Sequence, residues 1–263
     1  MNDRTGRDVA ATQVTRVFDT MGTTVSLVLH GRLTADRLEE VVGQVAAVFT
    51  AADARYSLYR PESELSCICR GDLRLPDASG ELRHMYDLAI DWRNKTNGAF
   101  TPHPGDGSID LSGVVKSWAI AQAGTILRKQ GLHCWCINAG GDVLTSGHTG
   151  KVPWIVGIIN PAERTALMAS VRMSQALPAL ATSGSAERGE HIWTHTQDAG
   201  GRFAQVSVLG PDIITADVLA TAIIAGGQDT LNLATSSWPV DVLVIDKEGD
   251  MLATPGFSAL LAT

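Results

Sequence analysis

The feature that most constrains this chain is an acidic residue at the start of a long apolar run. Asp217 precedes residues 218–225, which are almost wholly apolar, and Thr221 lies four residues after the acid. If the segment is helical, Asp217 and Thr221 lie on one face, one turn apart. The apolar run predicts burial of the helix, and a carboxylate is costly to bury unless a positive group lies against it. No Lys or Arg lies nearby in the sequence.

This pattern permits two interpretations. Two oxygen ligands on one helical face suit a hard cation such as Mg2+, which usually takes one or two protein carboxylates and leaves other positions to substrate phosphates. Alternatively, Asp217 stabilises a helix N-terminus and Thr221 bonds back to the preceding turn. On these residues alone the local interpretation is the simpler one.

The charge of the chain argues against several kinds of partner. The 263 residues carry a net charge of -7, whereas nucleic-acid binding requires a basic surface. Residues 1–13 are expected to form a flexible N-terminus, and no run of eighteen apolar residues occurs. We therefore expect a cytoplasmic protein without membrane insertion. A phosphate ligand would need local help from a metal, a Lys or backbone N–H groups.

Hydrophobic spacing separates a helical first half from a strand-rich second half. Helices are predicted over residues 34–54, with Thr34 as N-cap, and over 81–96, 112–130 and 215–226, with a loop at 99–110. Strands are predicted over 14–30, broken at Met21-Gly22, and over 134–145, 153–160, 166–172, 178–182, 203–209 and 240–246. Without repeats or a separating linker, this pattern indicates one α+β domain over residues 14–263.

The four cysteines form two C-x-C pairs, Cys67 with Cys69 and Cys134 with Cys136. A four-thiolate zinc site usually leaves at least two residues between paired cysteines, so the spacing matches poorly. We expect reduced and mostly buried thiols, as in a cytoplasmic protein.

Three loop motifs carry residues capable of chemistry. Asp110 can cap a helix whose free N–H groups, together with Lys116 one turn later, would form an anion site. The alternative is a plain cap and a solvated lysine. Residues 138–142 (NAGGD) follow an apolar strand, and their glycines favour a hairpin turn. His191 lies in a polar loop and has the chemistry of a general base, although a lone His is more often structural.

Seven segments taken together carry a resemblance that none carries alone. They are Met21-Gly22-Thr23; Ser57-Leu58-Tyr59 with Ser63-Glu64-Leu65-Ser66; Gly98-Ala99-Phe100-x-Pro102; Asp110-Leu111-Ser112-Gly113-x-x-Lys116; Asn138-Ala139-Gly140-Gly141-Asp142; Ala181-Thr182-Ser183-Gly184 with Arg188-Gly189-x-His191-Ile192; and Ala216-Asp217-x-Leu219-Ala220-Thr221-Ala222. In this order they resemble the ApbE-like FAD:protein FMN transferases, from about residue 17 to near residue 256.

The resemblance implies a fold and a reaction. The implied fold is a single ApbE-like, T-fold-related α+β domain with a mixed sheet and packed helices. The implied reaction is the Mg2+-dependent transfer of the FMN moiety of FAD to a Ser or Thr hydroxyl of an acceptor protein, with release of AMP. Some members of the family instead hydrolyse FAD to FMN and AMP.

The same resemblance assigns roles to individual positions. Asp217, Thr221 and the backbone carbonyl of Gly113 would hold the metal. Lys116 and His191 would be catalytic, with His191 taking the proton from the attacking hydroxyl. The positions implied to bind the flavin and the pyrophosphate are Met21, Tyr59, Ala99, Phe100, Thr101, Asp110, Lys116 and Trp193.

The chain also departs from the family pattern at four places. Thr101 stands where the family usually has Asp, Ser117 follows Lys116 in place of Gly, and Cys69 replaces an Asn. Residues 193–198 lack the Asp-Pro turn that usually follows the His-Ile pair. These changes leave two alternatives to FMN transfer: an FAD pyrophosphatase that uses water as acceptor, and a divergent flavin-binding protein without catalysis.

Overall fold

The computed structural model describes residues 12–148, 152–163, 165–184 and 203–262. Its largest element is an eight-stranded sheet in the order β1-β2-β3-β4-β7-β8-β9-β10. The strands are β1 (Thr12–Thr20), β2 (Thr23–Gly31), β3 (Trp135–Ala139), β4 (Asp142–Ser146), β7 (Ala179–Gly184), β8 (Phe203–Gly210), β9 (Asp241–Asp246) and β10 (Met251–Ala253). A separate two-stranded sheet pairs β5 (Ile155–Ile159) with β6 (Leu167–Arg172).

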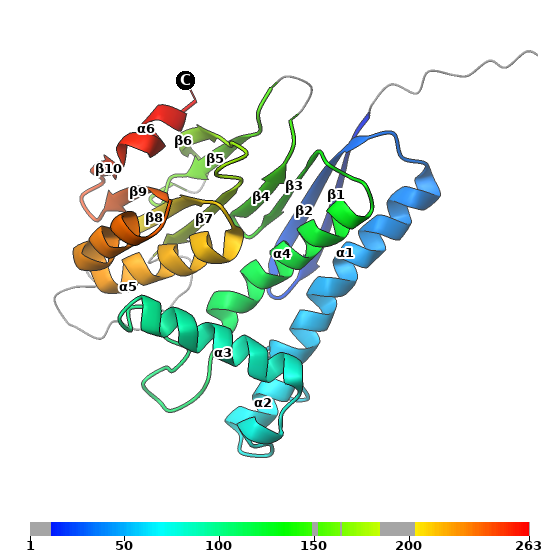
Figure 1. The fold of residues 1–263 in the computed structure, drawn as a ribbon, viewed down its shortest axis with the longest axis vertical. Coiled ribbons are helices and arrows are strands. Elements are labelled where there is room, and N and C mark those ends of the chain that lie inside the picture. Colours follow the sequence, from blue (N-terminus) through cyan, green and yellow to red (C-terminus); the bar gives the residue numbers. More distant parts are fainter. Residues whose placement is uncertain (1–11, 149–151, 164, 185–202, 263) are drawn as a thin grey trace, which may run out of the picture.

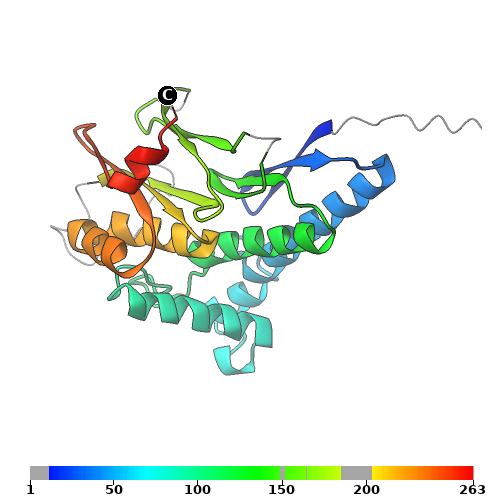
Figure 2. The ribbon, with the colours of Figure 1, turned by 45° about the horizontal axis from the view of Figure 1, so that its top comes forward.

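The helices lie mainly on one face of the large sheet, as Figures 1 and 2 show. They are α1 (Ala35–Tyr56), α2 (Glu64–Cys69), α3 (Gly80–Lys95), α4 (Ser112–Lys129), α5 (Ile213–Ser237) and α6 (Pro255–Leu260), with a 3-10 turn, η1, at Leu75–Asp77. α1, α4 and α5 form a row beneath the sheet, and α3 lies beyond that row (Figure 2). α6 and the β5–β6 pair cover part of the opposite face.

Side-chain alternation along the central strands supplies two hydrophobic cores. On β7, Ala179 and Ala181 face the helices, whereas Leu180 faces Ile158 and Phe257 on the other side. A strand that is covered on both faces has apolar residues at consecutive positions, which explains the Val, Ile and Leu content of the second half of the sequence. The larger core therefore lies between the sheet and α1, α4 and α5.

The α+β class is confirmed, and the strand pairings correct one detail of it. We expected a mixed sheet, but every described pairing in the large sheet is antiparallel. The connection between β2 and β3 explains the difference. Helices α1 to α4 lie between these strands in the sequence, and β3 then pairs with β2 in the opposite direction. The long connection forms a helical layer and does not cross over to a parallel strand.

Most element boundaries agree with the predictions from periodicity. Thr34 caps α1 by accepting a hydrogen bond from Arg37 N at 3.3 Å. The predicted helix 215–226 is part of α5, which continues to Ser237 through a kink at Gly227, where φ is 62°. The glycine pair at 226–227 marks the bend, because a positive φ interrupts the helix without ending it. The helices α2 and α6 and the strand β10 were not predicted.

β1 begins at Thr12, so the last two residues of the N-terminus that was expected to be flexible, residues 1–13, belong to the sheet. Residues 1–11 lie outside the described residues, and the single domain over residues 14–263 stays a prediction. Within the described ranges, the structure contains no helix with the length and apolar character needed to cross a membrane.

Candidate functional site

Two tight turns lie side by side at one end of the sheet. In the β1–β2 turn Met21 has a φ of 51°, and in the β3–β4 turn Gly140 and Gly141 have φ values of 61° and 95°. The N–H of Gly140 donates to Thr24 O at 3.2 Å, so the turns are joined through the pairing of β2 with β3. A Cβ on Gly140 would lie 2.5 Å from Thr23 Oγ1, which explains the glycine there. The hairpin interpretation of residues 138–142 is confirmed.

A buried ion pair connects this second turn to α4. Lys116 Nζ lies 2.5 Å from Asp142 Oδ2, and the two side chains are 18% and 0% exposed. The other carboxylate oxygen, Oδ1, accepts a hydrogen bond from Thr182 N at 3.3 Å. The interpretation of Lys116 as a solvated surface charge is therefore wrong. Its ammonium group is held at the sheet by an acid that the sequence had indicated only as part of a turn.

The loop before α4 brings two more motifs together. Asp110 Oδ1 accepts a hydrogen bond from Ser112 N at 2.8 Å, and Asp110 N donates to Pro102 O at 2.9 Å. Phe100 is buried against the first turn of α4, where a Cβ on Gly113 would lie 2.7 Å from Phe100 Cε2. The aromatic ring thus requires a residue without a side chain at position 113. The N-cap of α4 is Leu111, which makes no side-chain capping bond, so the expected cap by Asp110 is wrong; Asp110 bonds the N–H of the first residue of α4 from one position further back.

The same loop also reaches α5. A Cβ on Gly226 would lie 2.9 Å from Ala99 Cβ, so Ala99 packs closely against that helix. Thr101 Oγ1 accepts a hydrogen bond from His103 N at 3.2 Å, and the hydroxyl of Tyr86 lies 3.1 Å from His103 Nε2. Thr101, which replaces the usual acid, is therefore used to shape its own loop.

Helix α5 carries the acid and the hydroxyl with which the sequence analysis began. Asp212 caps the helix and accepts a hydrogen bond from Thr215 N at 2.8 Å, so Asp217 lies beyond the first turn and is not the cap. The side chain of Asp217 is completely buried. One turn later, Thr221 Oγ1 lies 3.1 Å from Ser183 Oγ on β7. Asp217 therefore lies in the second turn of α5, past the N-terminal turn at which the local interpretation expected it, and Thr221 contacts the sheet.

This donor set fits a small hard cation. Asp217 offers a carboxylate and Thr221 a hydroxyl, and α4, which begins with Ser112 and Gly113, packs directly against α5. Among the described residues no cluster of three or more His, Cys, Asp or Glu side chains could hold a metal. A site here would therefore depend on one carboxylate with neutral oxygens, a donor set that Mg2+ accepts when phosphates complete its coordination.

Tyr59 follows α1 and its side chain is 85% exposed. Its N–H donates to Ser57 Oγ at 3.2 Å, and the hydroxyls of Ser63 and Ser66 both donate to Ser57 O, at 2.6 and 3.1 Å. Ser63 also caps α2 by accepting a hydrogen bond from Ser66 N. The S-L-Y and S-E-L-S segments thus form one folded unit that presents the Tyr59 ring to solvent.

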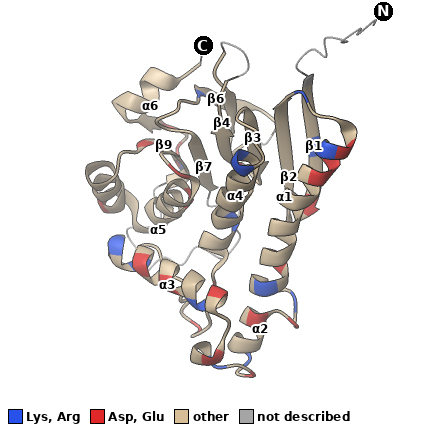
Figure 3. Cartoon of the chain, turned by 45° about the vertical axis from the view of Figure 1, so that its right-hand side comes forward, with Lys and Arg blue, Asp and Glu red and all other residues tan. Residues whose placement is uncertain are grey.

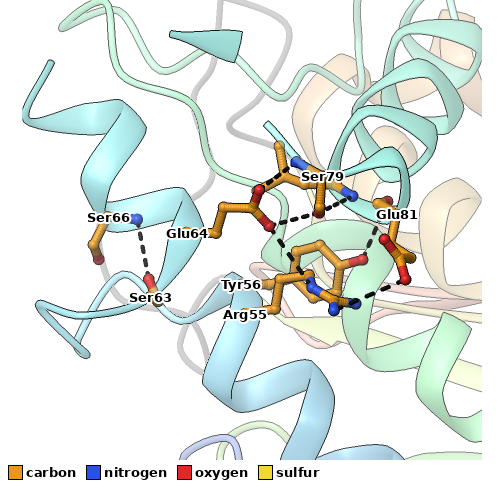
Figure 4. A network of polar contacts seen from close by, with 8 residues as sticks. Arg55, Tyr56, Ser63, Glu64, Ser66, Ser79 and Glu81 are labelled. Carbon is orange, nitrogen blue, oxygen red and sulfur yellow. Dashed lines mark hydrogen bonds and ion pairs between the residues drawn. The ribbon is translucent and has the colours of Figure 1, made fainter. Parts of the chain in front are cut away.

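A polar network anchors this unit to α3 (Figure 4). Glu64 accepts hydrogen bonds from the N–H and, at 2.6 Å, the hydroxyl of Ser79, and Arg55 lies 3.7 Å from the same carboxylate. The hydroxyl of Tyr56 donates to Glu81 O at 3.2 Å, and burial raises the pKa of Tyr56. The network holds the starts of α2 and α3 together at the end of α1.

The four cysteines lie among the described residues, where no group of three or more His, Cys, Asp or Glu side chains could hold a metal. All four thiols are free, as predicted, but Cys69 is exposed and the other three are only partly buried, so the expectation of mostly buried thiols is wrong. Burial raises the pKa of Cys136 to about 12. Cys69 Sγ donates to Ile109 O at 3.4 Å, next to Asp110, so the residue that replaces the usual Asn still contacts the loop before α4.

Two of the predicted site residues, His191 and Trp193, lie outside the described residues. A cavity of about 330 Å3, lined by Ile159, Gln205 and Asp246 among others, contains none of the predicted positions. Two residues that the structure brings to the site were not predicted to belong to it. These are Asp142, which pairs with Lys116, and Ser183, which contacts Thr221.

The fold and these contacts define an α+β protein in which two helices and the ends of two strands bring carboxylate and hydroxyl oxygens and a lysine into one connected set of contacts. Among solved structures, the flavin transferase ApbE from Vibrio cholerae superposes with a TM-score of 0.76 at 20% identity, covering 95% of this chain and 99% of that one. The ApbE protein from Thermotoga maritima gives a TM-score of 0.79 at 18% identity, covering 96% and 100%. These likenesses establish the fold.

The sequence comparison establishes the family. The model of the ApbE family matches residues 21–106 and 103–244, and the chain belongs to this family. A FAD:protein FMN transferase of Rhodobacter capsulatus is 34% identical over 166 residues, 58% of this chain and 31% of the relative. One of Vibrio cholerae serotype O1 is 27% identical over 153 residues, 54% and 46% respectively. The matches thus span less than half the length of these curated relatives.

Proposed function

We propose that this protein is an FAD:protein FMN transferase. In this reaction the FMN moiety of FAD passes to a Ser or Thr hydroxyl of an acceptor protein, Mg2+ is required, and AMP is released. Family membership and the names of the two curated relatives support the reaction class. The observation that carries the proposal is the placement of Asp217 and Thr221 on α5, joined through Ser183 to the strand that also contacts the Lys116–Asp142 pair.

The metal would be held by Asp217, Thr221 and the carbonyl of Gly113. When bound, Mg2+ neutralises the pyrophosphate of FAD and polarises the phosphorus that is attacked. Lys116 stabilises the negative charge that develops on the phosphoryl oxygens. His191 accepts the proton of the attacking hydroxyl.

The remaining predicted positions bind and orient FAD. Asp110 and Phe100 fix the loop before α4, and Ala99 packs this loop against α5. In this proposal Tyr59 and Trp193 contact the flavin, and Met21 and Thr101 line its site. An exposed aromatic ring such as that of Tyr59 suits stacking on a planar ligand.

The test is to incubate the purified protein with FAD, Mg2+ and a candidate acceptor protein that carries Ser or Thr in an exposed segment. We expect the acceptor to gain the mass of FMN less one water, because its hydroxyl forms a phosphodiester, and AMP to appear in equal amount. Mutation of the acceptor hydroxyl should abolish the mass increase. Absence of both AMP and protein-bound flavin across several acceptors would reject the proposal.

An FAD pyrophosphatase is the second candidate, because residues 193–198 lack the usual turn on the acceptor side. This activity needs no acceptor, so AMP and free FMN would form from protein, FAD and Mg2+ alone. The third candidate is a divergent family member that binds flavin without catalysis. It would give a yellow protein in which FAD stays intact during long incubation with Mg2+.

We also propose a cytoplasmic location and an acceptor protein as partner. The four free thiols support a reducing compartment, since exposed and partly buried cysteines persist there without pairing. The net charge of -7 supports a partner other than nucleic acid.

A further inference from the structure

We propose that Asp142 is a positioning residue that fixes Lys116 for the pyrophosphate of FAD and links this lysine to the metal-binding helix. This inference rests on the proposed function and deepens it. The sequence analysis gave Asp142 no role beyond the end of a glycine turn. The contacts of its carboxylate suggest one.

The first step is the geometry of the ion pair. Asp142 is the first residue of β4, directly after the Gly140-Gly141 turn, and its side chain is completely buried. Lys116 Nζ is 2.5 Å from Asp142 Oδ2, whereas 18% of the lysine side chain remains exposed. The acid is thus the buried partner and the lysine is the partner that reaches solvent.

The second step follows from hydrogen-bond capacity. A lysine ammonium group has three N–H donors, and the contact with Asp142 uses one of them. The others can reach phosphoryl oxygens that enter from the exposed side. The four-carbon side chain of a lysine without such a partner is flexible and samples many positions. Because Asp142 already holds the ammonium group, less conformational entropy is lost when a phosphate binds.

The third step extends the contact to α5. Oδ1 of Asp142 accepts the N–H of Thr182 at 3.3 Å, and the next residue on β7 is Ser183. Because successive side chains of a strand point to opposite faces, the side chains of Thr182 and Ser183 lie on different sides of the sheet. Ser183 is on the side of α5, where its Oγ lies 3.1 Å from Thr221 Oγ1. One carboxylate therefore holds the lysine and also the strand that faces the metal-binding helix.

A purely structural role is the main alternative. Buried ion pairs often contribute little net stability, and replacing both partners together can be neutral, whereas removing one leaves a buried charge. A second alternative is competition, in which Asp142 neutralises Lys116 and weakens its attraction for phosphate. Single and double variants distinguish these roles from positioning.

The experiment compares D142N, K116M and the double variant K116M/D142N in FAD binding and in AMP release. D142N retains an oxygen that can accept the Thr182 N–H but removes the charge. We expect each single variant to weaken FAD binding and slow AMP release by about 10- to 100-fold, the range for partners that orient functional groups. The double variant should be no worse than K116M, because Asp142 acts through Lys116. D241N, a matched Asp-to-Asn change on β9 whose side chain bonds Thr254 in the second core, should behave as wild type.

Several results would overturn the inference. They are wild-type behaviour of D142N, additive losses in the double variant, and recovery of FAD binding by the double variant. Tighter FAD binding by D142N would show competition and overturn it as well. If D142N does not fold, the double variant, which lacks an unpaired buried charge, still decides between positioning and a structural pair.

The two readouts separate this inference from the proposed function. A wild-type protein that binds FAD but never splits it would end the transferase proposal. Non-additive losses of FAD affinity would still support the role of Asp142. A wild-type protein that neither binds nor splits FAD would remove both.

Discussion

Helices α1 to α3 and helix α5 use charge in opposite ways. Acidic and basic residues occur together on α1, at both of its ends, and on α3, as Figure 3 shows, whereas α5 contains only two acids and no base in 25 residues. On α1 the pairs are exposed: Arg16 and Glu39 lie 2.8 Å apart with side chains 39% and 65% exposed. Such pairs contribute between zero and about 1 kcal/mol.

Three charged groups at the first half of α5 and beside it are instead buried. Asp217 and Asp142 are both completely buried, and Lys116 is mostly buried. Burying a charge costs free energy unless the charge is paired. Apolar side chains would pack at these positions without that cost, so the buried charges are not explained by packing alone. The difference indicates that the functional groups are the few buried charged residues around α5, and not the many exposed ones on α1 and α3.

The largest expected effect is that of Asp217→Ala on α5. Loss of the carboxylate should reduce AMP release by at least about 100-fold, as when one preorganised electrostatic group is removed from an active site. The matched control is Asp229→Ala, which removes the exposed second acid of the same helix. AMP release measured over a range of Mg2+ concentrations checks the prediction. Equal activity of the two variants would erase the contrast between buried and exposed acids.

A smaller effect is expected for Ser183→Ala. This change removes the hydroxyl that lies 3.1 Å from Thr221 Oγ1, and loss of a typical hydrogen bond costs about 1 kcal/mol, or about fivefold in an equilibrium constant. Binding of Mg2+ in the presence of FAD should weaken by about this factor, as titration calorimetry would measure. Ser236→Ala, at the exposed end of α5, is the control. A variant with unchanged Mg2+ affinity would show that the contact does not orient Thr221.

Stability should respond differently to the same mutation in the two regions. Gly124 on α4 faces the core, where a Cβ would lie 2.8 Å from the fully buried ring of Trp135. Gly124→Ala should lower the free energy of unfolding by about 1–2 kcal/mol, because overpacking exceeds the gain in helix propensity. Gly43→Ala on α1 meets open space and should raise it by about 0.5–1 kcal/mol. Urea unfolding measures both, and shifts of the same sign would contradict the account.

The smallest effect is expected at the exposed pair between β1 and α1. Glu39→Gln should change the free energy of unfolding by less than about 0.5 kcal/mol, because solvent and salt screen the interaction with Arg16. Thermal melts at low and high salt provide the measurement. A loss of several kcal/mol would mean that the exposed charges also stabilise the fold, and the comparison with α5 would fail.

Periodicity was sufficient to predict the elements with long regular patterns. The strands before and after Met21-Gly22, the capped start of α1 and the buried helix that carries Asp217 and Thr221 were all predicted, because each depends on local spacing. The extension of α5 beyond Gly227 was missed because a glycine pair is a local signal for a helix end, and only packing decides whether the helix resumes. The antiparallel order of the whole sheet likewise depends on long connections.

The contacts within the site could not be predicted in the same way. Lys116 and Asp142 are on a helix and a strand separated by β3, and Ser183 meets Thr221 across 38 residues of sequence. No spacing rule relates such positions, since their distances depend on how α4 and α5 pack on the sheet. The resemblance placed the motifs in one family, and the structure added that Asp142 and Ser183 connect them.

The most direct test of the central claim is AMP release by the wild-type protein with FAD, with Mg2+ present or chelated, and with and without an acceptor. The account predicts AMP only when Mg2+ is present, and FMN attached to the acceptor. Intact FAD after prolonged incubation with Mg2+ and acceptors, by a protein that binds FAD, would contradict it.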